Sequence, residues 1–309
     1  MNSLSEYIIE KLKINNDIVS KDPVYNYYPK DNKELRSIIE NLLKERGEDA
    51  DLNDIDTSEI TDMNSLFTNL NIHNIDISRW NVSNVKNMKY MFDRCGNFNC
   101  DLSKWNVSKV EDMTYMFSEC RNFNSDLSKW NVSKVEDMSD MFNYCMKFNA
   151  DLSSWNVSEV EDMRHMFDGC INFNSDLSRW NVSKVEYMHY MFYGCHNFSS
   201  DLSNWNVSRV EDMQCMFKNC INFDADLSKW NVSKVGDMRY MFDGCKKFNS
   251  DLSKWNVSKV EYMHYMFCGC NNFNSDLSNW DVSKVEDMQC MFKYCNSLKN
   301  KPDWYHYHE

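Results

Sequence analysis

The sequence predicts an α/β solenoid made of ten strand–turn–helix units, with a parallel sheet and a helical N-terminal cap. The stretch DLSKWNVSKVEDM begins at Asp101 and begins again, letter for letter, at Asp126. Related units of 25 residues follow one another without insertion from Asp51 to Asn300. A unit this short cannot bury its own apolar residues, whereas stacked copies can cover one another's faces.

A longer repeat lies within the array. The segments EDMRHMFDGC, EYMHYMFYGC and EDMQCMFKNC within residues 161–220 return in the same order, with few changes, within residues 236–295. Residues 151–225 and 226–300 therefore read as a tandem duplication of 75 residues.

Each unit is expected to contain a short helix. Ser108 and Glu111 have the spacing of a capping box, which places a helix start at Ser108. The apolar residues that follow fall on one helical face: Val110, Met113, Met116, Phe117 and Cys120. In several units a glycine stands just before the cysteine, which suits a helix C-terminus. These glycines are Gly169, Gly194, Gly244 and Gly269.

A short strand is predicted after the cysteine, over residues 123–128 in one unit. Phe123, Ser125 and Leu127 alternate with polar residues, and Trp130 breaks the alternation at a turn. Strands of successive units would form the parallel sheet. Strands sit closer together than packed helices do, so we expect a curved array.

The open ends of the array need covers, and residues 1–50 are predicted to form a helical N-terminal cap. Asp31 and Glu34 have capping-box spacing at the start of a helix that Gly47 would end. A shorter helix is predicted over Ser3 to Lys13. The apolar face of the longer helix carries Leu35, Ile38, Ile39, Leu42 and Leu43.

The ten-repeat solenoid is predicted to span residues 51–300, and residues 301–309 to form a C-terminal cap. Pro302 is a poor residue for an interior strand, whereas Trp304, Tyr305 and Tyr307 can lie over the last unit.

The charge of the chain restricts its partners. The 309 residues carry a formal net charge of −13, which repels the phosphates of nucleic acids and anionic lipid. No apolar stretch reaches about 18 residues, so no membrane insertion is expected. The N-terminus shows no secretory signal and neither end has a lipid-anchor cysteine, which favours a cytoplasmic location.

Cysteine is used periodically. Thirteen cysteines occur, and nine recur at one position of the unit. A disulfide framework varies its spacing and pairs its members, so these cysteines are better interpreted as small buried residues stacked on their own copies. The nine are Cys95, Cys120, Cys145, Cys170, Cys195, Cys220, Cys245, Cys270 and Cys295.

The recurring Asn-Val-Ser allows two interpretations. It matches the acceptor sequence for N-glycosylation. Alternatively, the serine caps the predicted helix while the asparagine bonds the turn backbone, and Asp281 in the last unit fits this second interpretation. The asparagines are Asn81, Asn106, Asn131, Asn156, Asn181, Asn206, Asn231 and Asn256, and Asn197-Phe-Ser makes a ninth acceptor sequence.

No metal, cofactor or catalytic residue is predicted. The aspartate that opens each unit could form a carboxylate row for Ca²⁺, but the glycine-rich turns of calcium-binding repeats are absent, so we expect these aspartates to face water near lysines. Cys268 and Cys270 form one CxC without a second pair, which is weak for zinc. The pattern contains no GxSxG, P-loop or GxGxxG motif, which argues against an enzyme. Other variable histidines and cysteines are His165, His189, His264, Cys215 and Cys290.

The units resemble those of a known family. DLSKWNVSKVEDMSDMFNYC and DISRWNVSNVKNMKYMF resemble the BspA-like leucine-rich-repeat family, in the type with Trp-Asn-Val-Ser and Asp-Met-x-x-Met-Phe found in bacterial surface lipoproteins. The likeness covers about residues 28–300, including a lead-in that resembles the helical cap of such arrays. It implies a leucine-rich-repeat-like solenoid and a role in adhesion or protein binding. Members usually carry a signal peptide or lipid anchor, and we expect neither in this sequence. The resemblance nevertheless implies a cell-surface or secreted location as the alternative to a cytoplasmic one.

Function is expected where the units differ. Unit positions 14, 15, 18, 19 and 21 vary, and Tyr, His and Arg occur there, which are residue types common at protein interfaces. The alternative is a tolerant solvent face. The predicted binding residues are Tyr90, Tyr115, Tyr144, Tyr190, Tyr193, Tyr240, Tyr265 and Tyr294.

We therefore predict a non-enzymatic repeat scaffold for protein–protein recognition, adhesion or host interaction, with a protein partner. The alternative is a structural or self-assembling repeat protein without a dedicated ligand.

Overall fold

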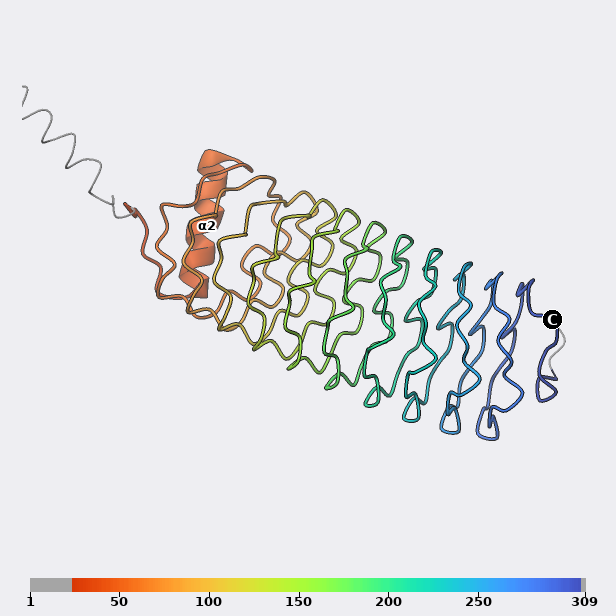
Figure 1. Cartoon of the computed structure of the whole chain (residues 1–309). Helices are drawn as coiled ribbons and strands as arrows, with labels where there is room; N and C mark the ends of the chain where they lie inside the picture. The colour runs from red at the N-terminus through yellow and green to blue at the C-terminus, as the bar shows by residue number, and fades with distance from the viewer. Residues whose placement is uncertain (1–23, 307–309) are drawn as a thin grey trace, which may run out of the picture.

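The chain forms a stack of coils that follow one another along a single axis (Figure 1). The computed structural model describes residues 24–306. In this range the one helix is α2, Asn32–Arg46, which lies at the N-terminal end of the stack. No strand of two or more residues forms between residues 24 and 306, and successive coils are joined by isolated parallel bridges. The predicted α/β solenoid with a parallel sheet is therefore wrong, whereas the 25-residue repeat appears as one coil per unit.

Nine of the eleven bridges within residues 24–306 occur where the sequence predicts a helix. Asp112 pairs with Asp137, and Asp137 pairs with Asp162, each at position 12 of its unit. Position 12 lies inside the predicted helix, which began at Ser108. The backbone that holds neighbouring coils together is therefore the segment predicted to be helical.

That segment is a run of tight turns with two kinds of hydrogen bond. Within the coil, the N–H of Met116 donates to the carbonyl oxygen of Met113 at 3.1 Å, three residues back. The next N–H, of Phe117, donates instead to Met141 in the following coil at 2.9 Å. This alternation repeats in each of the first nine coils, so every second N–H points along the stack.

Left-handed backbone explains why no helix forms. Tyr115 and Glu119 both have φ of 56°, and a helix requires φ near −60° at every residue. Gly169, predicted to end a helix, has φ of 74° and occupies the same left-handed position as Glu119. Helices also need about 8–10 Å between axes, whereas hydrogen-bonded backbones lie about 4.8 Å apart, so a coil of turns stacks more closely than a coil with a helix.

The predicted strand over residues 123–128 is a segment without assigned strand structure. Phe123 and Leu127 are buried, as the alternation predicted. Its links to the preceding coil use side chains, because the N–H of Asn124 donates to Oδ1 of Asn99 at 2.9 Å. An asparagine or aspartate at this position makes the same link in several other coils. The strand prediction is wrong because these links replace a backbone ladder.

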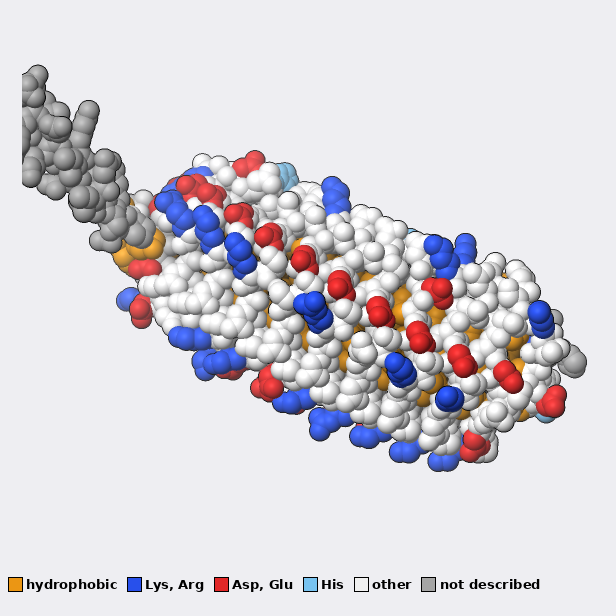
Figure 2. Space-filling model, viewed as in Figure 1, with side chains coloured by type: hydrophobic (Ala, Val, Ile, Leu, Met, Phe, Trp, Pro, Cys, Tyr) orange, Lys and Arg blue, Asp and Glu red, His pale blue; other side chains and the backbone are white. Residues whose placement is uncertain are grey.

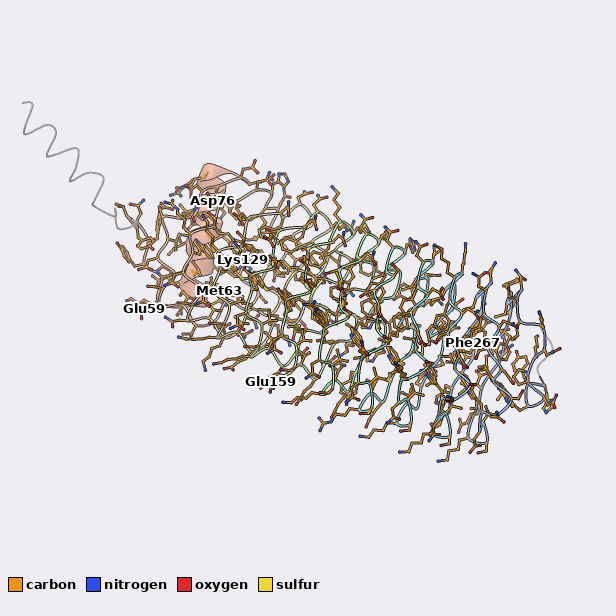
Figure 3. The ribbon with its side chains drawn as sticks, in the orientation of Figure 1. Glu59, Met63, Asp76, Lys129, Glu159 and Phe267 are labelled. Atoms are coloured by element: carbon orange, nitrogen blue, oxygen red, sulfur yellow. The ribbon has the colours of Figure 1, made fainter. Side chains whose placement is uncertain are left out.

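The core consists of side chains stacked in columns along the axis. Phe117 and Phe142 stack with ring centroids 5.6 Å apart, and Trp180 and Trp205 stack at 6.5 Å. Met63 and Phe267 both belong to the buried core and have no exposed area (Figure 3). Each coil buries its apolar residues against its neighbours, which a single coil could not do.

The polar atoms of the core residues also bind the preceding coil. Trp180 Nε1 donates to the carbonyl oxygen of Leu152 at 3.0 Å, and Cys170 Sγ donates to that of Phe142 at 3.0 Å. All thirteen cysteines are free thiols, and the nine periodic ones are buried. Their prediction as small buried residues in a column is confirmed.

Helix α2 begins and ends at the predicted residues and covers the first coil. The N–H of Glu34 donates to Oδ1 of Asp31 at 2.8 Å, and that of Gly47 donates to Leu43 at 2.9 Å. Leu35, Ile39 and Leu42 are buried. The shorter helix predicted over Ser3 to Lys13 lies outside the described residues.

Side chains of α2 also bind the backbone edge of the first coil. Asn32 Nδ2 donates to the carbonyl oxygen of Asn64 at 2.7 Å, and Arg36 Nη1 donates to that of Leu66 at 3.2 Å. Arg36 Nη2 reaches the carbonyl oxygen of Thr68 at 3.4 Å. In later coils the equivalent carbonyl groups accept from the preceding coil, so α2 replaces a coil that is not there.

The C-terminal end is covered less completely. Trp304 extends the tryptophan column: it stacks on Trp280 at 6.4 Å and donates to Leu277 at 3.0 Å. Tyr305 lies edge-on against Phe292 at 5.0 Å. Trp304 and Tyr305 thus lie over the last coil as predicted, while Tyr307 is outside the described residues. Four N–H groups that would bind a further coil have no partner within residues 24–306, namely those of Met288, Cys290, Phe292 and Tyr294.

Candidate functional site

Two left-handed residues in every coil shape its variable surface. Position 15, as in Tyr115, and position 19, as in Glu119, have positive φ in all ten coils. Bulky residues rarely adopt this conformation. Because all coils share it, the strain belongs to the geometry of the coil and not to one site. We call the surface formed by positions 14, 15, 18 and 19 of successive coils the tyrosine face.

All eight predicted tyrosines lie on the tyrosine face, and some of them meet. Tyr90 and Tyr115 stack with ring centroids 4.9 Å apart, and Tyr240 and Tyr265 stack at 5.0 Å. The stacked rings are partly buried. Such pairs fix the side chains and add about 0.5–1.5 kcal/mol each beyond area burial.

The other four tyrosines are arranged differently. Tyr190 and Tyr193 lie 5.7 Å apart with tilted rings, and Tyr190 also stacks on His165 at 4.6 Å. Tyr144 and Tyr294 stand at position 19 and are 44% and 66% exposed. The eight residues therefore form a discontinuous row rather than one cluster.

Buried polar groups lie in the middle of the tyrosine face. Asp140 and Asp168 are each 6% exposed. His165 Nδ1 lies 2.9 Å from Oδ2 of Asp168. Burial raises the pKa of Asp140, and burial together with the charge of Asp140 raises the pKa of Tyr115 to about 12.

Most cations of this face have partners within the chain. Arg239 pairs with Asp237 and lies over the ring of Tyr262 at 5.3 Å. Lys218 lies 3.0 Å from Asp243. The face thus offers aromatic rings and carboxylates more than free positive charge.

The two histidines at position 14 of the duplicated units lie beside carboxylates, although Nδ1 of each is buried without a hydrogen-bond partner within residues 24–306. Nδ1 of His189 lies 3.4 Å from Oδ2 of Asp212, and Nδ1 of His264 lies 2.9 Å from Oδ2 of Asp287. Burial lowers the pKa of His189 and raises that of Asp212, which weakens the charged form of that pair. No group of three or more potential metal ligands occurs in the described part of the chain.

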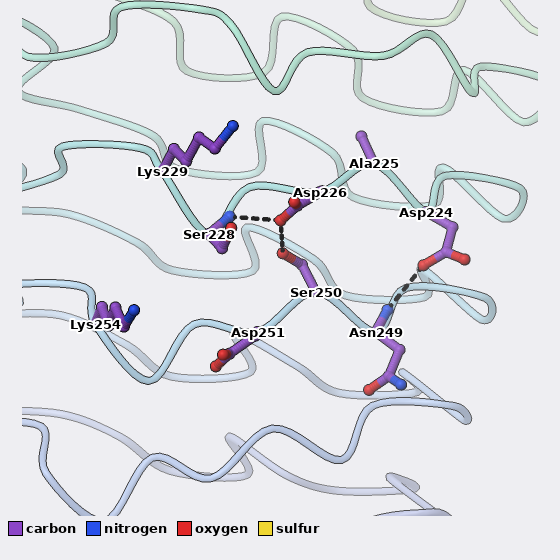
Figure 4. Close-up of a pocket in the computed structure, with 9 residues that line it drawn as sticks. All are labelled: Asp224, Ala225, Asp226, Ser228, Lys229, Asn249, Ser250, Asp251 and Lys254. Carbon is purple, nitrogen blue, oxygen red and sulfur yellow. Dashed lines mark hydrogen bonds between the residues drawn. The ribbon is translucent and has the colours of Figure 1, made fainter.

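A second surface is a polar groove along the aspartate row. A row of acidic side chains runs along the stack with basic side chains beside it (Figure 2). Asp76, which opens its coil, and Lys129 mark the acidic row and the basic side chains in the same view (Figure 3). A stretch of this groove of about 830 Å³ is lined by Asp226, Ser250 and Asp251 (Figure 4).

The carboxylates of the groove maintain local turns. Oδ1 of Asp226 accepts the N–H of Ser228 at 2.9 Å, and Ser253 binds Asp251 in the same way at 3.0 Å. These bonds to serine lower the pKa of both aspartates. The aspartates face water with lysines nearby, as predicted, and their geometry is the repeat itself rather than a singular site.

The Asn-Val-Ser motif has a structural role in the turn. Oδ1 of Asn181 accepts the N–H of Ser183 at 3.2 Å, and Asp281 does the same for Ser283 at 3.1 Å. The predicted bond of the asparagine to the turn backbone is confirmed. The predicted helix cap by the serine is wrong, because no helix follows.

The sequence prediction missed Asp140 and Asp168 as site residues. Asp140 stands at position 15, where a tyrosine is usual, and this break in the pattern was the available signal. Asp93, Asp168 and Asp243 all stand at position 18 of their units, so the sequence does not mark Asp168 as different from the other two. Only the surroundings of Asp168 distinguish it.

Within the described residues no helix is both long enough and apolar enough to span a membrane.

Comparison with known proteins identifies one family. No curated protein and no solved structure matches the chain. The family described as "Mycoplasma protein of unknown function, DUF285" matches three overlapping segments, residues 35–152, 124–227 and 194–305. Because these segments together cover well over half of the sequence, the chain belongs to the family of Mycoplasma proteins of unknown function DUF285.

Proposed function

We propose that the protein is a non-enzymatic repeat scaffold that recognises a protein partner through the tyrosine face. The observation that carries this proposal is a contrast between two sets of positions. The core columns repeat the same residue types along the stack, whereas the tyrosine face changes from coil to coil on the same backbone. Variable side chains on a fixed backbone are how repeat proteins build extended binding surfaces.

The residue types and their rigidity support the proposal. Tyrosine is enriched among residues that dominate binding energy, and Tyr144 and Tyr294 are well exposed. Stacked pairs such as Tyr90 and Tyr115 are held before a partner arrives, which reduces the entropy lost on binding. The net charge of −13 favours a partner with a basic surface.

Adhesion or host interaction is the finer form of this proposal. The resemblance of the units to BspA-like leucine-rich repeats supports it, and a location at the cell surface belongs to the same hypothesis. Labelling of intact cells with a membrane-impermeant reagent would test the location.

Self-assembly is the alternative, and the two ends of the stack argue against it for the full chain. The N–H groups of Cys290 and Phe292 are donors without partners within residues 24–306. The matching acceptors at the other end are bound by Asn32 and Arg36. Within residues 24–306 the two ends are therefore not complementary, and we expect sedimentation of the full chain to show no growth of oligomers with concentration.

The test uses substitutions that other coils already contain. Tyr144→Asn with Tyr193→Ser alters the tyrosine face, because Asn219 and Ser118 stand at the equivalent positions. Lys129→Ser with Lys229→Asn alters the groove in the same way, following Ser154 and Asn204. Both double variants should fold.

The immobilised full chain and the two variants are then exposed to cell lysate and to extracellular matrix. We expect a protein that the unaltered chain and the groove variant capture and the tyrosine-face variant does not. Equal capture by both variants, or capture lost only in the groove variant, contradicts the proposal.

A further inference from the structure

The tandem duplication places Asp168 and Asp243 at equivalent positions with different surroundings. Both stand at position 18 of their unit and precede a left-handed glycine, Gly169 with φ of 74° and Gly244 with φ of 78°. The backbone around the two carboxylates is therefore the same. A comparison of their partners shows what each one binds.

Asp243 is paired with a cation from the chain itself. Nζ of Lys218, at position 18 of the preceding coil, lies 3.0 Å from Oδ2 of Asp243. The same ammonium group lies 4.0 Å from the centroid of the Tyr240 ring. Burial is the largest single effect on Lys218 and lowers its pKa, but the hydrogen bond to Asp243 and the charge of Asp243, with smaller contributions from neighbouring groups, together raise the pKa of the lysine. A carboxylate beside an aromatic ring thus holds an ammonium group at this position of the coil.

Asp168 lacks that cation. The residue at the position of Lys218 is Asn143, and its amide donates to Oδ1 of Asp140 at 3.1 Å. Oδ2 of Asp168 lies 2.9 Å from Nδ1 of His165. Oδ1 is buried and has no hydrogen-bond partner among residues 24–306, in a side chain that is 8% exposed. A buried acceptor without a donor raises the free energy of the folded chain. A further donor that binds this oxygen would therefore stabilise the chain.

The ring of Tyr144 and two glycines lie close to Asp168. The ring of Tyr144 lies over Gly169, since a β-carbon on that glycine would be 2.9 Å from its Cδ1 atom. The charge of Asp168 is the main cause of a raised pKa of Tyr144, which agrees with their proximity. Tyr193 occupies position 18 of the following coil, and Gly194 leaves the surface beside Gly169 without a side chain.

We infer that Asp168 receives a lysine or arginine side chain of the protein partner, as Asp243 receives Lys218. This inference rests on the proposed function and specifies the chemistry of the partner. The exposed ring of Tyr144 turns aside to admit the cation, which then binds Oδ1 and lies against the tyrosine rings. The net charge of −13 attracts a basic segment toward the face.

Three variants of the full chain test the inference with fluorescently labelled tetralysine as the probe. Asp168→Asn removes the charge and keeps the shape of the side chain. Asp243→Asn makes the same change in net charge at the carboxylate that Lys218 already fills. Asn143→Lys copies Lys218 in front of Asp168. Fluorescence anisotropy at low salt measures the affinity, and thermal unfolding confirms that each variant is folded.

We expect Asp168→Asn to weaken tetralysine binding at least about tenfold and Asp243→Asn to leave it unchanged. Asn143→Lys should weaken binding as much as Asp168→Asn and raise the melting temperature, because the lysine fills the site from within. Equal weakening by the two Asp→Asn variants would mean general attraction to an acidic surface and would overturn the inference.

Capture of the protein partner by the same variants distinguishes a failure of this inference from a failure of the proposed function. If Asp168→Asn still captures the partner while Tyr144→Asn with Tyr193→Ser does not, the tyrosine face binds without the cation and only this inference fails. If capture survives in all of these variants, the proposed function fails as well.

Discussion

Trp180 donates a hydrogen bond from its indole Nε1 to the carbonyl oxygen of Leu152 in the preceding coil, at 3.0 Å. The ring is 3% exposed and stacks on Trp155 and on Trp205 at 6.5 Å. One side chain therefore joins three coils through both stacking and a directed bond. Its counterparts make the same bond to the preceding coil from Trp80 to Trp304.

Removal of one tryptophan from this column should destabilise the whole stack. We expect Trp180→Ala to lower the free energy of unfolding by about 3–5 kcal/mol, because it leaves a cavity and an unpaired carbonyl group. Urea unfolding followed by circular dichroism measures the change. Arg179→Ala, next to it but exposed, should change stability by less than about 0.5 kcal/mol. A small effect of Trp180→Ala would place this ring outside the core.

Gly169 at position 19 should be more stable than alanine there, although other coils carry larger residues at this left-handed position. We expect Gly169→Ala to cost about 1–2 kcal/mol of stability, because its φ of 74° is unfavourable for a β-carbon, which would also clash with the Tyr144 ring at 2.9 Å. Thermal unfolding measures the loss.

Gly236→Ala is the matched control. That glycine has no positive φ, and a β-carbon there would meet nothing closer than 4.0 Å. The substitution should stabilise the chain by about 0.4–1 kcal/mol. If both substitutions changed stability by the same amount, backbone handedness would not explain position 19.

The repeat, the buried residues and helix α2 could be predicted from the sequence because each follows from residue types at regular or characteristic spacings. Columns such as Cys145 above Cys170 follow from period alone, and Asp31 and Gly47 mark the ends of α2 by their local chemistry. These features depend on residue type and spacing.

The conformation of each coil could not be predicted in this way. Val110, Met113 and Phe117 fit one face of a helix, but the same spacing also suits turns whose hydrogen bonds span three residues. The deciding feature is the left-handed backbone at position 15, where Tyr115 gives no sign of positive φ. Hydrogen bonds to the next coil hold that conformation, and these bonds cannot be recognised in the sequence of one unit.

The candidate site shows the same division. The exposure of Tyr144 followed from its variable position, whereas the burial of Asp168 depends on which residues stand beside it in neighbouring coils. The difference between Asn143 and Lys218 has a meaning only once the coils are stacked.

The N-terminal end should depend on Arg36. We expect Arg36→Ala to cost about 1–3 kcal/mol, because its guanidinium group donates to the carbonyl oxygens of Ser65 and Leu66 at 2.5 and 3.2 Å. Hydrogen exchange should show the first coil opening before the others.

Arg36 also pairs with Glu40 at 2.8 Å on the same helix, and Glu40→Ala isolates that contribution. An exposed ion pair of this kind contributes less than about 0.5 kcal/mol. Equal losses from Arg36→Ala and Glu40→Ala would show that the bonds to the first coil do not matter.

The cysteine column should make the fold sensitive to alkali. Burial raises the pKa of Cys145 and Cys170 well above the ordinary 9.0, and that of Cys95 to about 12. The folded chain therefore keeps these protons at a pH where the unfolded chain releases them. Their contribution is complete below about pH 9 and falls as pH rises, by about 1.4 kcal/mol per pH unit for each thiol.

Urea unfolding between pH 8 and pH 11 measures this slope. Cys170→Ala removes one thiol from the column and should make the slope shallower. A stability that stayed constant from about pH 9 to pH 11 would contradict the burial of these thiols.

Photo-crosslinking tests the central claim, that the tyrosine face binds the partner. The full chain carries p-benzoylphenylalanine in place of Tyr144 on the tyrosine face or, in a second preparation, in place of Lys129 beside the groove. After irradiation with the captured partner, we predict a covalent adduct from position 144 and none from position 129. An adduct from position 129 and none from position 144 would contradict the account.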